Sequence, residues 1–104
     1  MSTPEQGEVW WAEAEDKRRP VLVCTRSEAV SVLSAVVVAP VSWTVRGIPT
    51  EVALGREEGL DVECAASFDS LQTVPRAALT QRLGALDALR RLEMCAALRA
   101  MSDC

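Results

Sequence analysis

The order of strand-like and helix-like segments along the chain is the feature that most limits its possible folds. Short apolar stretches interrupted by glycine and proline come first, and a single long helical pattern ends the chain. Parallel strands need long crossover connections, usually helices, between them, and none is indicated here. The order therefore predicts a small curled antiparallel sheet followed by one terminal helix.

The valine-rich run at residues 35–39 is the strongest strand candidate, since β-branched side chains suit a pleated, buried surface. Pro40 is expected to end the ladder hydrogen bonds of that strand. The other strand candidates are residues 8–14, 21–25, 50–54, 60–63, 66–69 and 71–74. Turns are expected at 15–19, closed by Pro20, and at 76–79, while residues 26–34 fit either a helical turn or a loop.

Two neighbouring tryptophans lie in the first strand candidate, at positions 10 and 11. Because side chains alternate between the faces of a strand, one of them points inward and the other outward. We expect Val9 and Trp11, and further along Ala14, on the inward face.

A helix is expected from about Ala88 to Met101, with Asp87 as its N-cap. At 100° per residue the helix has two apolar sides. One is formed by Leu89, Leu92 and Ala96, and the other by Met94, Leu98 and Met101. This arrangement fits a surface helix over the sheet whose apolar and polar faces are not cleanly separated. It also fits a helix covered on two sides, one of them by another subunit.

The length of 104 residues suits one domain, which we place at residues 7–104 behind a flexible tail of residues 1–6. The tail is too short and polar for a signal peptide, and no apolar run approaches membrane-spanning length. We therefore expect a cytoplasmic protein that does not contact a membrane, with reduced cysteines.

The absence of histidine limits the available chemistry. It excludes the usual serine-hydrolase triad and removes the commonest general acid–base near neutral pH. The cysteines are scattered without metal-ligand spacing, at positions 24, 64, 95 and 104. We therefore expect neither a metal site nor a cofactor, and Cys24 and Cys64 have the apolar surroundings of core residues.

The net charge of −4 and the pI near 4.8 are unusual for a protein that binds nucleic acid. A local basic cluster can still bind phosphate within an acidic molecule. The candidates are Lys17, Arg18, Arg19 and Arg46.

Arg19 and Ser42 are predicted to meet at one end of the sheet. If strands 21–25 and 35–39 form a hairpin in which Thr25 faces Val36, the numbers of paired residues sum to 61. Arg19 and Ser42 have the same sum. The hairpin would thus gather the basic cluster and a hydroxyl near Trp43, whose indole offers a surface for base stacking.

Such a cluster suits cleavage of the RNA backbone, in which the substrate's own 2′-hydroxyl attacks the phosphate. The protein must then orient the attack and neutralise the charge that builds on the phosphoryl oxygens, which arginine does well. The proton acceptor is open between Glu13, Asp16 and water. By composition alone, residues 15–19 also fit a solvated turn, and Ser42 a turn residue bonded to its own backbone.

The chain resembles the MazF/PemK family of toxin endoribonucleases from about Gly7 onward. The matching segments are GEVWWA at 7–12, RRPVLV at 18–23, VVAPVS at 37–42, RGIPTEV at 46–52 and the tail from Thr73 to Met101. The resemblance implies an α+β, mainly β fold: a small SH3-like antiparallel barrel with a C-terminal α-helix. It further implies a type II toxin that acts as a homodimer, cleaves single-stranded RNA without a metal and is bound by a cognate antitoxin.

The resemblance assigns the catalytic roles to Arg19, the arginine of an Arg-Pro strand entry, and to Ser42 at the end of the third strand. Residues expected to contact RNA are Lys17, Arg18, Trp43, Thr44 and Arg46. The turn before Arg19 is shorter than the family's usual loop, and Gln72 stands where the family commonly has an arginine. The shorter turn would alter substrate reach or leave the site open. The lost arginine, together with the acidic net charge, suggests a narrower or different RNA target, such as a structured tRNA.

Two other functions fit the same barrel. One is a binding protein like the related toxins that poison DNA gyrase, and the other is a degenerate relative kept as a dimerising module. The pair of Arg19 and Ser42 favours the nuclease, because a gyrase binder has no evident need of it.

Overall fold

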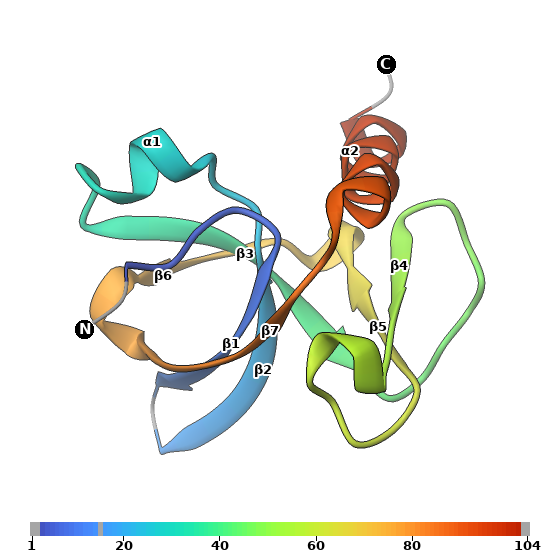
Figure 1. Ribbon diagram of the computed structural model, residues 1–104, viewed down its shortest axis with the longest axis horizontal. Helices are drawn as coiled ribbons and strands as arrows, with labels where there is room; N and C mark the ends of the chain where they lie inside the picture. The colour runs from blue at the N-terminus through green and yellow to red at the C-terminus, as the bar shows by residue number, and fades with distance from the viewer. Residues whose placement is uncertain (1–2, 15, 103–104) are drawn as a thin grey trace.

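A strongly curled antiparallel sheet forms most of the molecule, and a C-terminal helix packs across one end of it (Figure 1). The computed structural model describes residues 3–14 and 16–102. The strands are β1 (Glu8–Ala14), β2 (Lys17–Val23), β3 (Ala35–Ser42), β4 (Glu51–Leu54), β5 (Cys64–Ser67), β6 (Gln72–Pro75) and β7 (Leu79–Ala85). The helices are α1 (Ser27–Val30), α2 (Ala88–Ser102) and the 3-10 turns η1 (Arg56–Glu58), η2 (Phe68–Ser70) and η3 (Arg76–Ala78). The mainly β, antiparallel fold with a C-terminal helix that the sequence predicts is confirmed.

Strand β3 is the hub of the sheet, whose order is β4-β5-β3-β2-β1-β7 with β6 also paired to β3. It pairs with β6 over residues 35–38, with β2 over 38–40 and with β5 over 41–42. The predicted end of the strand at Pro40 is wrong, because the strand runs on to Ser42. Pro40 lies between the part of β3 that pairs with β6 and the part that pairs with β5, so its missing N–H falls at a change of partner.

The turn before the second strand is tighter than predicted. Ala14 pairs with Lys17, so only two residues lie between β1 and β2, and residues 17–19 belong to the strand. Asp16 adopts a φ of 66°, a left-handed conformation that aspartate tolerates. The basic residues Lys17, Arg18 and Arg19 are therefore held on a strand instead of a loop.

Two further differences concern the second half of the chain. The predicted strand at 60–63 is wrong: a 3-10 turn and bends occupy residues 56–63. Strand β7 was not predicted at all, and its side chains from Thr80 to Arg82 are exposed. Because only one face of such a strand touches the domain, its sequence lacks the strong apolar signal of β3. The helical turn that was one alternative for residues 26–34 is present as α1.

The curled sheet has an apolar core on each of its two faces. Val9 and Leu22 pack with Met94 and Ala97 of α2, while Trp10, on the other face, belongs to a cluster that includes Val30 of α1. The expectation that Trp11 points into the core is therefore wrong, because Trp10 is the buried tryptophan and Trp11 is only half-buried. Both faces are covered along much of β1, so alternation alone does not identify the inward residue. The side chain of Ala14 lies outside the described residues.

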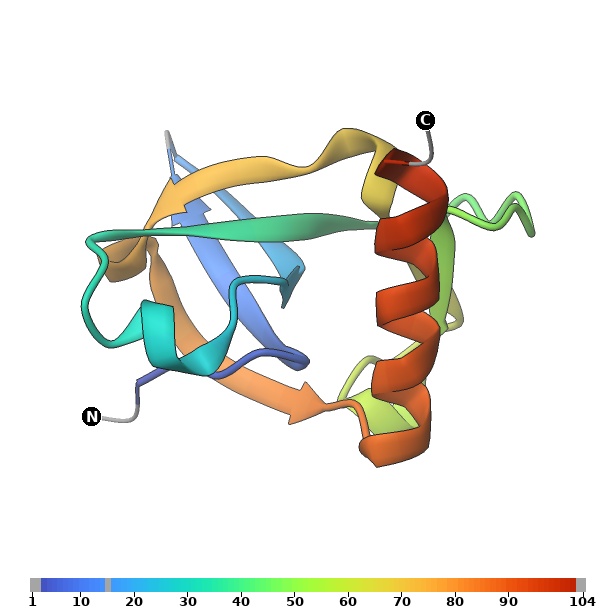
Figure 2. The same ribbon diagram turned by 90° about the horizontal axis from the view of Figure 1, so that it is seen from above.

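Helix α2 begins as predicted: Asp87 accepts a hydrogen bond on Oδ1 from the Arg90 N–H at 2.8 Å. Of its two apolar sides, the one with Met94 packs against the sheet near β4 and η2 (Figure 2). The other remains open, with Leu89 77% and Leu92 66% exposed. Within the described ranges, no helix is long and apolar enough to cross a membrane.

The segment before β1 is attached to the domain at its end. Gln6, which the sequence placed in a tail, donates from Nε2 to the Cys24 carbonyl at 2.9 Å and from its backbone N–H to Ser27 Oγ at 3.1 Å. Met1 and Ser2 lie outside the described residues, and the division into a tail and one domain stays a prediction.

Two glycines let η1 pack directly on the backbone of β7. A Cβ at Gly84 would lie 2.3 Å from the Glu58 carbonyl oxygen, and one at Gly59 would lie 2.1 Å from the Leu83 carbonyl oxygen. These distances exclude any side chain without backbone movement. The contact fixes β7, and through it the start of α2.

Gly84→Ala should therefore lower the free energy of unfolding by about 2–3 kcal/mol, the upper part of the usual range for overpacking, because the added Cβ meets backbone atoms. Chemical denaturation measures this change. Gly55→Ala is the matched control, because a Cβ there meets no atom within 4 Å; its effect should stay below about 1 kcal/mol. Equal effects of the two substitutions would contradict the close packing of η1 on β7.

Candidate active site

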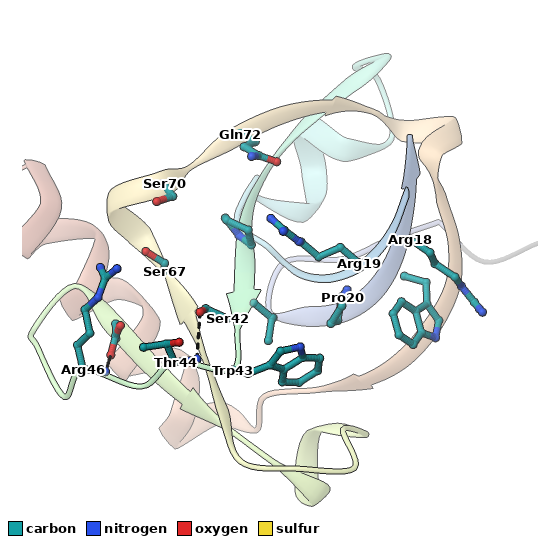
Figure 3. Close-up of a pocket in the computed structure, with 14 residues that line it drawn as sticks. Arg18, Arg19, Pro20, Ser42, Trp43, Thr44, Arg46, Ser67, Ser70 and Gln72 are labelled. Carbon is teal, nitrogen blue, oxygen red and sulfur yellow. Dashed lines mark hydrogen bonds between the residues drawn. The ribbon is translucent and has the colours of Figure 1, made fainter. Parts of the chain in front are cut away.

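An open cleft of about 670 Å³ lies beside the point where β3 exchanges partners (Figure 3). Its walls come from β1, β2, the end of β3, the loop at residues 43–50 and the segment around η2. The lining residues are Trp11, Arg18, Arg19, Pro20, Pro40, Val41, Ser42, Trp43, Thr44, Arg46, Glu51, Ser67, Ser70 and Gln72.

Arg19 and Ser42 both line this cleft, as the predicted register required. The observed pairs Val21↔Pro40, Leu22↔Ala39 and Val23↔Val38 all have residue numbers that sum to 61, which confirms the register. Beyond these pairs the two strands no longer pair with each other: Arg19 keeps its partner Ala12 in β1, and Ser42 pairs with Ala65 of β5. The sheet thus holds both residues on strands, although the strands have separated at this point.

The Ser42 hydroxyl has a defined role in its loop. Its Oγ accepts a hydrogen bond from the Thr44 backbone N–H at 3.1 Å. The hydroxyl hydrogen is not used in that bond. Ser42 therefore keeps a donor for a ligand in the cleft.

Three of the four predicted cations meet in the cleft. Arg18, Arg19 and Arg46 line it, and all three are exposed, whereas Lys17 does not line it. In Figure 3, Arg18 and Arg46 lie on opposite sides of Arg19 and Ser42. The cleft is thus a local basic surface within an acidic chain.

Two indoles line the cleft, and they differ in what covers them. Trp43 is 59% exposed, so its ring is open to a ligand. Trp11 lies under Arg18, whose guanidinium carbon is 4.4 Å from the ring centroid. Arg18 also donates from Nη2 to Gln81 Oε1 at 3.0 Å, which holds it over the ring.

One carboxylate, that of Glu51, is among the lining residues. Neither Glu13 nor Asp16, the two acidic side chains considered as proton acceptors, is among them. Glu51 instead binds the loop through Oε1, which accepts from the backbone N–H groups of Arg46 at 2.8 Å and Gly47 at 3.0 Å.

Sequence reasoning missed Trp11, Glu51, Ser67 and Ser70 as lining residues. Glu51 and Ser67 are paired across β4 and β5, so correct pairing of those strands would have placed them together. Ser70 follows β5 in η2, beside Asp69, which accepts a hydrogen bond from Thr50 Oγ1 at 2.5 Å.

The two buried cysteines, Cys24 and Cys64, are poorly suited to bind a metal or to react. Burial raises the pKa of the Cys24 thiol to about 12, and burial together with the nearby Glu58 raises the pKa of Cys64. Cys95 is exposed on α2, and Cys104 lies outside the described residues. Across the described part of the chain, no three histidine, cysteine or acidic side chains gather closely enough to hold a metal ion.

The arrangement can bind a phosphodiester and a base side by side. The guanidinium groups offer charge and forked hydrogen bonds to phosphate oxygens, and the serine hydroxyl offers a further donor. Trp43 offers an open ring for stacking next to them. These are the elements that a single-stranded nucleic acid needs for both backbone and base contacts.

Comparison with known proteins agrees with this geometry. The sequence profile of the family described as PemK-like, MazF-like toxin of type II toxin–antitoxin system matches residues 5–102. The chain is 43% identical over 105 residues to a probable endoribonuclease, MazF5, of Mycobacterium tuberculosis, covering 97% of this chain and 94% of the relative.

Solved structures agree as well. The M. tuberculosis toxin MazF-mt6 superposes with a TM-score of 0.85 at 35% identity, covering 92% of this chain and 96% of that one. A mycobacterial endoribonuclease in complex with its cognate antitoxin shares the fold, with a TM-score of 0.82 at 23% identity over 95% of this chain and 94% of that one. The chain belongs to the PemK-like, MazF-like toxin family of type II toxin–antitoxin systems.

Proposed function

We propose that this toxin is an endoribonuclease that cleaves single-stranded RNA at selected sequences without a metal ion. The single observation that carries the proposal is the meeting of Arg19 and Ser42 in one open basic cleft. The endoribonuclease names of its relatives support it independently.

In the proposed reaction the 2′-hydroxyl of the substrate gives its proton to water and attacks the adjacent phosphorus, and the 5′-oxygen of the next nucleotide leaves and takes up a proton from water. Arg19 neutralises charge on the phosphoryl oxygens, and the Ser42 hydroxyl donates a hydrogen bond to one of them. Both groups act by position and charge, so no covalent intermediate with the protein is needed.

RNA binding is assigned to the residues around this pair. Arg18 and Arg46 contact phosphates on either side, Trp43 stacks on a base, and Thr44 contributes a hydroxyl at the cleft wall. Lys17 contacts RNA only if the bound strand extends past the cleft. Gln72, which lines the cleft in place of a further cation, limits the phosphate contacts and favours a narrow target such as a structured tRNA.

Two protein partners complete the proposal. A cognate antitoxin covers the basic cleft, as type II toxins are paired with antitoxins. A second copy of the chain covers the open side of α2, where Leu89 and Leu92 are exposed, to form a homodimer. We place this activity in the cytoplasm, where its RNA substrates are found.

Purified protein should cut a mixture of mRNA, rRNA and tRNA at defined sites in EDTA. Arg19→Ala and Ser42→Ala should each lower the rate about 100-fold or more, because each removes a group that stabilises the transition state. Gel analysis with primer extension measures both rate and sites.

Arg26→Ala and Ser70→Ala are the matched controls. Arg26 is exposed outside the cleft, and Ser70 is a serine that lines the cleft without a proposed catalytic or binding role; both variants should keep cleavage within about threefold. Loss of all cutting in EDTA, or cutting indifferent to Arg19 and Ser42, would overturn the mechanism. Intact RNA together with inhibition of DNA gyrase would instead establish the binding-protein alternative.

The salt dependence of RNA affinity tests the assigned phosphate contacts. Arg18→Ala and Arg46→Ala should each lower the slope of log K against log salt by about 0.7, the value for one phosphate contact on a single strand. Fluorescence anisotropy of a labelled RNA, measured in an Arg19→Ala background to prevent cutting, gives the slope. Arg26→Ala should not change it, and an unchanged slope for Arg46→Ala would remove that contact.

A further inference from the structure

The loop between β3 and β4, residues 43–50, carries the exposed side chains at the end of the cleft. Two side chains that flank it hold its backbone: Ser42 Oγ accepts from the Thr44 N–H, and Glu51 Oε1 accepts from the N–H groups of Arg46 and Gly47. One bond lies at the start of the loop and two lie in its middle. The loop is therefore fixed by the strand residues on either side of it.

The Glu51 bonds need the particular backbone conformation at Gly47. Its φ is +68°, in the left-handed region, and a Cβ there would meet no atom within 4 Å. Glycine is therefore present for its conformation and not for space. Successive N–H groups that point to one side form a concave site for an anionic oxygen, and here the Glu51 carboxylate fills it.

Glu51 itself is held firmly. It is paired with Ser67 of β5 in the sheet, and its N–H donates to the Ile48 carbonyl at 3.0 Å. A side chain anchored in the sheet thus determines where Arg46 lies relative to Ser42. Glu51 also brings a negative charge into a cleft that is otherwise lined by basic and neutral residues.

We propose that Glu51 is a positioning residue for the reaction, acting through the backbone of residues 46 and 47. It preorganises the loop so that Arg46 and Trp43 meet the RNA without a prior ordering step. The proposal rests on the proposed function. Its distinctive content is that Glu51 acts as a hydrogen-bond acceptor for the loop and not as the proton acceptor of the reaction.

Glu51→Gln and Glu51→Ala separate these two roles. Glutamine keeps an oxygen that accepts both N–H groups but loses the carboxylate, so kcat should stay within about threefold, and KM for RNA should fall as a negative charge leaves the cleft. Alanine leaves both N–H groups without that acceptor, so kcat should fall about 10- to 100-fold, the scale of a small misplacement of catalytic groups. Glu28→Ala, which removes an exposed carboxylate on α1, is the control and should match the wild type.

An equal loss of kcat in both Glu51 variants would overturn the proposal in favour of a carboxylate that transfers a proton. A wild-type kcat for Glu51→Ala would overturn it as well. In both variants, thermal unfolding verifies that the sheet is intact.

A second measurement is independent of cleavage. In protein labelled with 5-fluorotryptophan, 19F NMR gives separate signals for Trp10, Trp11 and Trp43, assigned through Trp43→Phe and Trp11→Phe. Glu51→Ala should shift and broaden the Trp43 signal and leave buried Trp10 unchanged, while Glu51→Gln should leave both unchanged. An unmoved Trp43 signal in Glu51→Ala overturns the proposal whether or not the protein cuts RNA, and a moved signal without RNA cleavage by the wild type would refute only the proposed function.

Discussion

The exchange of partners along β3 is the constraint on which the rest of the structure depends. Strand β2 pairs with β3 only as far as Pro40, and beyond it β3 continues with β5 on its other edge, so the end of β3 becomes one wall of a cleft instead of a covered core strand. Pro40 lies at this point, where its missing N–H costs little. The same opening separates Arg19 from Ser42 enough to leave room between them, while the ladders on either side keep both residues on rigid strands.

Sequence alone predicted the parts of the fold that depend on local and alternating patterns. The valine run at 35–39 identified the hub strand, the register assumed for its hairpin with β2 was correct, and Asp87 correctly marked the start of α2. Strand β7 was missed because many of its side chains are exposed, so its sequence lacks the apolar pattern of a strand. Its position also depends on the contact of Gly84 with η1. That contact joins distant segments, so no local pattern reveals it.

The candidate site was predictable to the extent that it follows from one hairpin. The register brought Arg19 and Ser42 to one end of the sheet, and the neighbouring sequence added Arg18, Trp43 and Arg46. Lys17 was expected there too, but strand β2 carries it outside the cleft. Trp11 and Glu51 were missed for other reasons. The place of Trp11 depends on which face of the curled sheet is covered, and the place of Glu51 depends on the pairing of β4 with β5.

The central claim is that the cleft orients an attack by the substrate's own 2′-hydroxyl. Its most direct test is an RNA with a mapped cleavage site in which the nucleotide on the 5′ side of the cut bond carries a single 2′-deoxy substitution. We predict that this bond stays intact while the all-ribose substrate yields a 2′,3′-cyclic phosphate, identified by mass spectrometry. Cleavage of the deoxy substrate at the same bond would contradict the account, because an external nucleophile would then be required.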